Sequence, residues 1–251
     1  SGNGNTVAIG APGNDRVRIY KNNVGTWSQL GTDIEGEALP SNSFGNQSFG
    51  CSVSLSSNGN RVAIGASLNS GVNGAASGHV RILEYDGVMW NLMGQEIDGE
   101  ATQDKSGYSV SLNSAGNIVA IGSPKHDAGS GHVRIFSYNG SSWNQLGQDI
   151  DGEAAIDNSG YSVSLSSDGN TVAIGATGND GNGSNSGHVR IYEFNGSFWN
   201  QIGNDIDGEA SADKSGWSVS LSSDGNTVAI GAQKNDGNGS ESGHVRIYNY
   251  N

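Results

Sequence analysis

One sequence segment is repeated along this chain, and this repeat limits the possible folds more than any other feature. Residues 160–192, GYSVSLSSDGNTVAIGATGNDGNGSNSGHVRIY, return nearly unchanged at residues 216–248. Looser copies begin at Gly50 and Gly107, and a shorter copy opens the chain. A chain that repeats one sequence builds one supersecondary unit several times and stacks the copies. We therefore predict a repeat architecture.

Each copy contains four short segments with the pattern of β-strands, which we call A to D. Segment A is SVSLS, B is VAIGA and C is HVRIY, as seen in residues 162–192, and D is WNQLG, as seen in residues 143–147. Polar and apolar residues alternate in A and C, which predicts strands with one apolar face. In B, Val and Ile share one face, while Ala and Gly on the other face let a neighbouring layer approach.

Turn residues with glycine in a fixed place separate segments A and B. Such pairs accept the positive φ of tight hairpins, so A and B are expected to pair antiparallel. A second turn separates C from D, whereas the B–C connection varies in length and is expected to be an exposed loop. The A–B turns are Asn58-Gly59, Ala115-Gly116, Asp168-Gly169 and Asp224-Gly225.

The period of the repeat selects among the stacked all-β folds. The B segments begin at Val7, Val62, Val119, Val172 and Val228, at spacings of 55, 57, 53 and 56 residues. Four strands at this period are typical of a β-propeller blade, whereas a β-solenoid has shorter repeats. We predict one all-β propeller domain, residues 1–251, of about five antiparallel four-stranded blades. The approximate units are residues 1–38, 39–101, 102–154, 155–210 and 211–251.

The ends of the repeat array are incomplete. The chain begins with B, C and D, continues with three full units, and ends with A, B and C. Both ends carry B and C, so they duplicate each other and cannot complete one shared blade. Open strand edges invite strands of other chains. We expect either a fragment of a longer repeat protein or a subunit that self-associates head to tail through its open blades into rings or filaments.

The charge and the single cysteine exclude several partners. The 251 residues include 12 basic and 25 acidic side chains, so a nucleic-acid partner, which needs clustered Lys and Arg, is not expected. No apolar run approaches a membrane span and no signal peptide begins at Ser1, so membrane insertion is not expected. Cys51 is alone, which excludes an intrachain disulfide, and we expect it to be a small buried residue.

Short motifs at the A and B segments resemble the FG-GAP repeats of integrin alpha-chain propellers and of related secreted bacterial and algal proteins. They are Phe49-Gly50 and Gly10-Ala11-Pro12, with a weaker match at Gly122-Ser123-Pro124. The resemblance spans essentially the whole chain. It implies a propeller with segment A innermost and D outermost, in an extracellular or cell-surface adhesion protein. The family's calcium cage lies in the A–B hairpin, where this chain offers only Asp168 or Asp224, so we expect that cage to be absent.

The acidic linkers that follow segment D are the remaining candidates for metal ligands. The residues leave two interpretations open: carboxylates that accept hydrogen bonds and join adjacent blades, which we favour, and ligands of calcium. No cofactor is expected under the first interpretation, and calcium is the alternative. The candidate residues are Asp149, Asp151, Glu153 and Asp157, and in the next copy Asp205, Asp207, Glu209 and Asp213.

Other repeated polar and aromatic residues have structural interpretations. His79, His132, His188 and His244 belong to different blades, too far apart to share a metal, and are expected to pack as polar core residues. The tryptophans of segment D are expected to be structural, with a sugar-stacking role as the alternative. Asn-x-Ser sequons are possible glycosylation sites but also ordinary turns. They are Asn46, Asn139, Asn182, Asn195 and Asn238.

Nothing in the sequence predicts catalysis. No Ser/His/Asp set stands out from the repeats, and no phosphate-binding loop leads from a strand into a helix. We predict a non-catalytic, extracellular structural or adhesive propeller whose partners are other protein chains, including copies of itself. The alternative is a lectin-like propeller that binds glycans.

Overall fold

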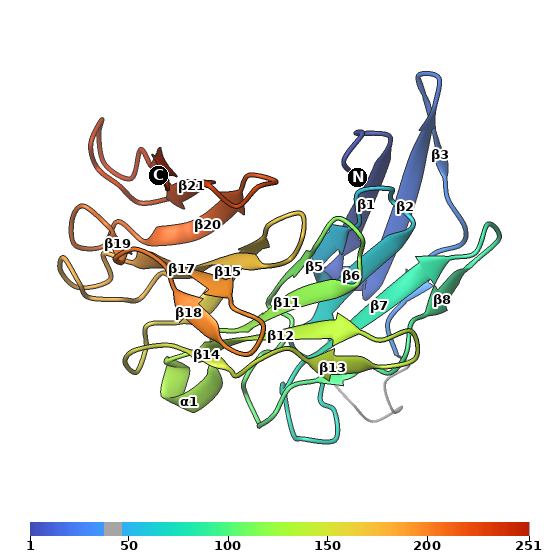
Figure 1. The fold of residues 1–251 in the computed structure, drawn as a ribbon, viewed down its shortest axis with the longest axis horizontal. Helices are drawn as coiled ribbons and strands as arrows, with labels where there is room; N and C mark the ends of the chain where they lie inside the picture. Colours follow the sequence, from blue (N-terminus) through green and yellow to red (C-terminus); the bar gives the residue numbers. More distant parts are fainter. Residues whose placement is uncertain (38–46, 251) are drawn as a thin grey trace.

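The computed structural model describes residues 1–37 and 47–250, which form five antiparallel sheets arranged in chain order along an arc (Figure 1). The first sheet holds β1 (Thr6–Ala11), β2 (Arg16–Asn23), β3 (Thr26–Gln29) and β4 (Ile34–Glu35). The second holds β5 (Phe49–Leu55), β6 (Arg61–Ala66), β7 (His79–Tyr85), β8 (Trp90–Leu92) and β9 (Ile97–Asp98). The third holds β10 (Ser109–Leu112), β11 (Ile118–Ser123), β12 (His132–Tyr138), β13 (Trp143–Gln145) and β14 (Ile150–Asp151).

The last two sheets repeat this arrangement. The fourth holds β15 (Ser159–Leu165), β16 (Thr171–Ala176), β17 (His188–Phe194), β18 (Trp199–Gln201) and β19 (Ile206–Asp207). The fifth holds β20 (Ser215–Leu221), β21 (Thr227–Ala232) and β22 (His244–Asn249). Short helical turns, η1 (Pro12–Asn14) and α1 (His126–Gly129), lie in B–C connections. The predicted all-β class and blade architecture are confirmed.

The strand order within a sheet is the predicted A–B–C–D meander. In the second sheet the order is β5-β6-β7-β8, and every pairing is antiparallel. Gly169, in the turn from β15 to β16, has φ +82°, which is the left-handed conformation expected of a tight hairpin. The first described sheet has no strand of type A and the fifth has none of type D. Sequence periodicity therefore placed the strands and their turns correctly.

The acidic linkers also contribute secondary structure, which the sequence pattern did not predict. Part of each linker forms a fifth, two-residue strand that pairs with the beginning of the C-type strand. In the second sheet β9 pairs with β7 through His79↔Asp98 and Val80↔Ile97. The D-type strand covers only the other end of β7. The short strand thus satisfies backbone groups that the D-type strand leaves open at this edge.

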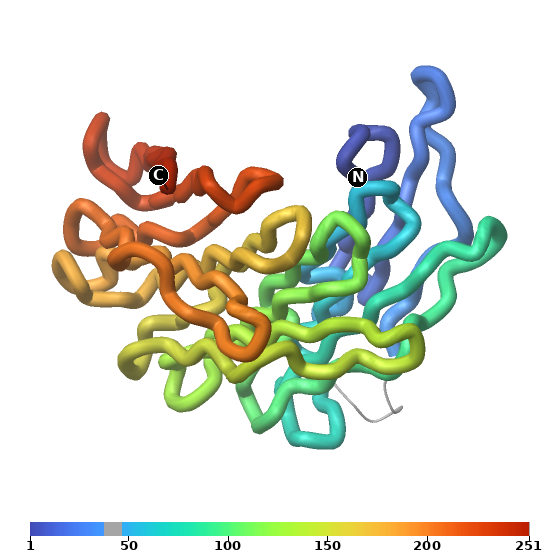
Figure 2. Tube along the Cα trace, viewed as in Figure 1, coloured from blue at the N-terminus to red at the C-terminus, as the bar shows by residue number. Residues whose placement is uncertain are grey.

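The A-type strands lie innermost, as the resemblance implied. The strands β5, β10, β15 and β20 contact one another in series around the arc, and β1 contacts β5. The tube in Figure 2 shows both termini at the two ends of this arc, in the first and the fifth sheet. The hydrophobic core is not one mass. Four apolar clusters occupy the four interfaces between successive sheets, which we call seams.

Candidate functional site: the two end faces of the arc

The same two faces meet at every seam. We call the face toward the preceding sheet the front face and the other the rear face. At the fourth seam Val189, on the rear face of the fourth sheet, packs with Val228 and Ile230 on the front face of the fifth. The pattern follows from the alternation of side chains along a strand. Val and Ile of the B-type strands lie on the front face of their sheet, and Val and Ile of the C-type strands lie on the rear face.

Glycine pairs set the spacing of the seams. Gly175 of β16 lies against Gly216 of the next sheet, and a Cβ atom on Gly175 would overlap the Gly216 carbonyl oxygen. Gly65 meets Gly107 in the same way. The predicted role of glycine on this face, which is to let a neighbouring layer approach, is confirmed. Gly231 is the corresponding residue of the fifth sheet, and its added Cβ would meet only Ser218 of its own sheet.

Both ends of the arc expose a face that is buried elsewhere. On the front face of the first sheet Val7 is 38% exposed and Ile9 51%, whereas Val62 and Ile64 at the equivalent positions are 0% exposed. On the rear face of the fifth sheet Val245 is 67% exposed and Ile247 71%. A cavity of about 360 Å³ opens beside Val245, lined also by Trp217 and Gly231. One chain therefore carries both halves of a seam on its two ends.

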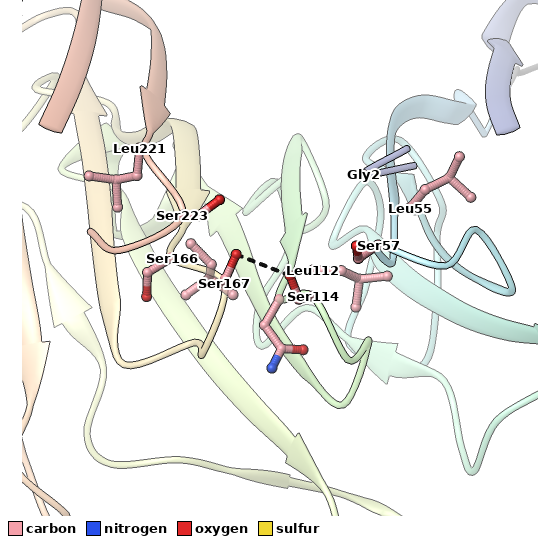
Figure 3. Close-up of a pocket in the computed structure, with 11 residues that line it drawn as sticks. Gly2, Leu55, Ser57, Leu112, Ser114, Ser166, Ser167, Leu221 and Ser223 are labelled. Carbon is pink, nitrogen blue, oxygen red and sulfur yellow. Dashed lines mark hydrogen bonds between the residues drawn. The ribbon is translucent and has the colours of Figure 1, made fainter. Parts of the chain in front are cut away.

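Backbone hydrogen bonds run around the axis of the arc with a fixed direction. The amide of Ser57 donates to the Ser114 carbonyl at 2.9 Å, Ser114 donates to Ser167 at 3.0 Å, and Ser167 donates to Ser223 at 2.9 Å. Gly2 begins the series by donating to Ser57 at 2.9 Å. Figure 3 shows these serines around a central cavity of about 360 Å³, which Leu55 and Leu112 also line. The direction of the series makes the two ends of the arc chemically different.

The tryptophans of the D-type strands are structural in the interior sheets. Trp143 is buried and its Nε1 donates to the Met93 carbonyl of the preceding sheet at 2.8 Å; Trp199 donates to Leu146 at 2.7 Å. Trp27 of the first sheet has no preceding sheet in the described chain and is about half exposed. The structural interpretation holds for the buried tryptophans, because an indole that is buried and hydrogen-bonded across a seam offers no open platform to a sugar.

The carboxylates of each predicted acidic cluster have different hydrogen-bond and ion-pair partners in the structure. Asp157 is buried, and its Oδ2 accepts hydrogen bonds from the Ala154 amide at 3.2 Å and from Asn179 Nδ2 at 3.1 Å. Asp213 accepts from Ala210 and Asn235 in the same manner. These two carboxylates therefore fasten the linker to the B–C loop of the next unit.

The other members of each cluster face glutamines, arginines and histidines. Asp149 Oδ1 accepts from Gln145 Nε2 at 2.5 Å, and Asp205 Oδ1 accepts from Gln201 Nε2 at 2.6 Å. Arg190 lies 3.5 Å from Glu153 and donates to the Asp151 carbonyl. In the fifth sheet Arg246 lies 3.8 Å from Glu209 and donates to the Asp207 carbonyl.

The repeated histidines lie at four separate seams, as expected. His79, His132 and His188 are buried, while His244 is partly exposed. Burial lowers the pKa of His188, and burial together with His126 and Arg134 lowers the pKa of His132 to about 3. The imidazoles of these two residues are therefore neutral at neutral pH.

The A–B hairpin uses its aspartates in the turn itself. Asp168 Oδ1 accepts hydrogen bonds from Ser166 Oγ at 2.6 Å and from the Asn170 amide at 3.0 Å. Asp224 has the same partners in the fifth sheet, Ser222 and Asn226. These contacts close the turn, as side-chain oxygens of Asp commonly do.

Two predicted features differ from the structure or lie partly outside it. Cys51 is exposed and not buried: it lies where the strand register shifts between Phe49 and Ser52, at the border of the seam, with its Sγ 3.5 Å from the Gly107 carbonyl oxygen. The sequons at Asn139, Asn182, Asn195 and Asn238 are exposed, while Asn46 lies outside the described residues. Sequence reasoning missed the ladder of tilted aromatic rings at the position of Cys51, where Tyr161 lies 5.0 Å from Tyr108 and 4.8 Å from Trp217 between ring centroids.

Comparisons with known proteins agree with this architecture. Residues 150–192 and 206–248 match the FG-GAP repeat, so the resemblance inferred from sequence is confirmed in these two units. No match to a curated protein is found.

The similar solved structures share the fold at 13% sequence identity each. A protein described as a candidate 6-phosphogluconolactonase from Bacteroides uniformis has a TM-score of 0.67, with 100% of this chain and 65% of that chain covered. Hydrazine synthase from Kuenenia stuttgartiensis has a TM-score of 0.60, with 99% and 69% covered. TolB from Acinetobacter baumannii has a TM-score of 0.51, with 97% and 51% covered. This chain thus spans about two thirds of the first of these structures. Within the described residues, no helix has the length and apolar character needed to cross a bilayer.

Proposed function

We propose that this chain is a non-catalytic, extracellular structural or adhesive propeller subunit that binds further copies of itself head to tail. The observation that carries the proposal is the exposure of two complementary seam faces on one chain. Val7 and Ile9 form one face, and Val245 and Ile247 form the other. The four interior seams demonstrate that faces of these two types pack against each other.

The occupant of each end face is a second copy, because that copy brings the complementary residues. The rear face of the fifth sheet would receive the front face of another first sheet, as the rear face of the fourth receives Val228 and Ile230. Ser223 would continue the axial series of amide-to-carbonyl bonds into the next copy, since the preceding serines all donate in that direction. Contacts between unlike faces do not saturate in a dimer; they produce rings or filaments.

Complementation of two disabled variants tests the head-to-tail geometry. Ile9→Asp disables the front face and leaves the fold intact, because Ile9 is half exposed and pairs across the ladder with Arg18. Val245→Asp disables the rear face. We expect the native chain to form higher oligomers in sedimentation experiments, each variant alone to be monomeric, and an equimolar mixture of both to form a dimer and nothing larger.

The dimer forms in the mixture because each variant retains the one face that the other has lost. A native chain that stays monomeric across concentrations contradicts the proposal. A native oligomer that neither substitution disrupts contradicts this choice of surfaces.

The extracellular location rests on the FG-GAP resemblance and on the acidic composition, a net charge of −13. Labelling of intact source cells with a reagent that does not cross membranes tests it. We expect labelling of this chain without cell lysis. Labelling only after lysis contradicts the location while leaving the assembly untouched.

A carbohydrate-binding function is the second candidate, and one observation favours it. The rings of Tyr108, Tyr161 and Trp217 form a continuous ladder on successive A-type strands, and Trp217 is about one third exposed. Sugars stack on exposed aromatic faces of this kind. Binding on a glycan array that Trp217→Ala abolishes would favour this candidate, whereas an array without signal would exclude it.

A further inference from the structure

The seams bring together a histidine and two carboxylates from sequence-distant parts of the chain. At the third seam Glu153 comes from the linker after the third sheet, His188 begins the C-type strand β17, and Asp205 precedes β19. His188 Nδ1 lies 3.9 Å from Glu153 Oε2 and 3.7 Å from Asp205 Oδ2. The three potential ligand atoms all lie within 4.8 Å of one another.

The imidazole is buried and has no hydrogen bond at the nitrogen that faces the carboxylates. His188 is 1% exposed, and its Nδ1 has no hydrogen-bond partner within the described residues. Separations of 3.7 and 3.9 Å are too long for hydrogen bonds. A buried polar atom without a partner costs free energy, so a group between these atoms would remove an existing penalty.

In the first sheet, a positively charged side chain occupies the position that His188 has in the fourth sheet. There Arg16 stands where His188 stands in the fourth sheet, and Asp33 takes the place of Asp205. Arg16 Nη1 lies 3.1 Å from Asp33 Oδ2, so a guanidinium supplies the positive charge. In the fourth sheet the lowered pKa of His188 leaves the imidazole neutral, and the ion pairs of Asp205 within the described chain involve His188 alone.

From this geometry we infer that the seams bind a divalent transition-metal ion, of which Zn²⁺ is the representative, through one histidine and two carboxylates. Zinc accepts imidazole nitrogen and carboxylate oxygen at about 2.0–2.2 Å, which places neighbouring ligand atoms about 3.3 Å apart in a tetrahedron. The separations from His188 Nδ1, 3.7 and 3.9 Å, are longer than this value, so the carboxylates would have to move inward to coordinate an ion. A neutral imidazole is also the form that coordinates metal.

The nitrogen ligand selects against calcium. Calcium prefers six to eight oxygen ligands, whereas one imidazole with two carboxylates suits zinc and similar ions. Both carboxylates are partly exposed, Glu153 to 46% and Asp205 to 31% of their side-chain area, so an ion can enter from solvent. A fourth position remains for water.

The arrangement recurs at the other seams. Glu37, His79 and Glu96 form the equivalent group at the first seam, where His79 Nδ1 lies 3.8 Å from Glu96 Oε2. At the second seam His132 groups with Asp149 and Asp151, and a second group there joins it to Glu100, with His132 Nδ1 3.9 Å from Glu100 Oε2, and to a second histidine, His126. Each histidine serves its own site, so the separation of the histidines along the chain is no obstacle.

Metal titration of the chelator-treated full chain tests the inference. We expect saturable Zn²⁺ binding by calorimetry with three equivalents, one for each of His79, His132 and His188, and a Co²⁺ adduct with visible absorption bands. Zn²⁺ also raises the melting temperature, because it binds the native state. Ca²⁺ produces neither signal.

The chain itself supplies the matched variant. His188→Arg copies the residue found at Arg16, introduces a cation beside Asp205 and removes the ligand. We expect this variant to fold, by circular dichroism, and to bind one equivalent fewer; Asp205→Asn, a near-isosteric change, should lose the same equivalent. Absence of saturable Zn²⁺ binding overturns the inference, and so does a stoichiometry that neither variant lowers. Loss of fold in His188→Arg leaves Asp205→Asn as the deciding variant.

Discussion

At the scale of single residues, glycine determines how closely the sheets approach. Each interior B-type strand places a glycine where the next sheet presents a backbone carbonyl, as Gly175 does against Gly216. A side chain there has to push two backbones apart, and backbones in paired strands cannot yield as a flexible side chain can. The tolerance for larger residues at this position therefore depends on whether a sheet follows.

Gly175→Ala is expected to destabilise the fold by about 1–3 kcal/mol, the usual cost of overpacking a close interface. Gly231→Ala is the matched control, because its added Cβ meets the same kind of serine but no following sheet. Urea unfolding of both variants at concentrations below self-association measures the difference. Equal free energies of unfolding for the two variants would show that the seam is not the source of the cost. The head-to-tail proposal adds that Gly231→Ala weakens assembly.

At the scale of elements, identical strands have different environments according to their place in the arc. The strands β1 and β6 share the sequence VAIGA, yet Ile64 of β6 is fully buried whereas Ile9 of β1 is half exposed. Strand propensity is the same in both, so the difference in stability belongs to packing against the preceding sheet.

Ile64→Ala is expected to reduce the free energy of unfolding by about 2–5 kcal/mol, because it leaves a cavity in the first seam. Ile9→Ala removes the same atoms from a half-exposed site and is expected to cost at most about 1 kcal/mol. Chemical denaturation of the monomeric protein compares them. A large loss for Ile9→Ala in the monomer would mean that the front face of the first sheet is covered within a single chain.

The elements also show how far sequence reasoning reaches. Local sequence patterns predicted the strands and the turns. The alternation of residues such as Ile64 indicated the two faces of each B-type strand, and glycines such as Gly169 indicated the turns. The short strand β9 could not be foreseen, because its two residues pair with the beginning of β7 across another strand and a turn. The grouping of Glu153, His188 and Asp205 could not be predicted for the same reason, since Glu153 belongs to the preceding unit and Asp205 follows His188 by 17 residues of strand and turn. The exposure of Cys51 follows from a register shift that no local pattern reports.

At the scale of the whole molecule, the arc is a one-dimensional series of sheets. Each apolar cluster joins two successive sheets, and no cluster of the described residues joins the fifth sheet to the first. Stability in such arrays is close to a sum of sheet terms and nearest-neighbour seam terms. The third sheet has two seams, whereas the first and the fifth have one each.

Amide hydrogen exchange is expected to reflect this difference. In dilute, monomeric protein the amides of β11 and β12 should be the most protected, and those of β21 and β22 should exchange faster, because local opening of an end sheet breaks only one seam. Mass spectrometry of exchanged peptides measures this. Uniform protection from the first to the fifth sheet would indicate that the arc unfolds as one unit and that the ends are joined.

The series of seams also decides how the molecule responds to force. The first strand and the last belong to opposite ends of the arc, so a pull on the two termini loads the four seams in series (Figure 2). A closed ring shares such a load between two paths, whereas an open arc has one. Under tension the sheets therefore separate in discrete steps, and each step lengthens the chain by one unit while the remaining seams still hold. A sawtooth of nearly equal spacing in a pulling experiment would be the mechanical signature of the repeat.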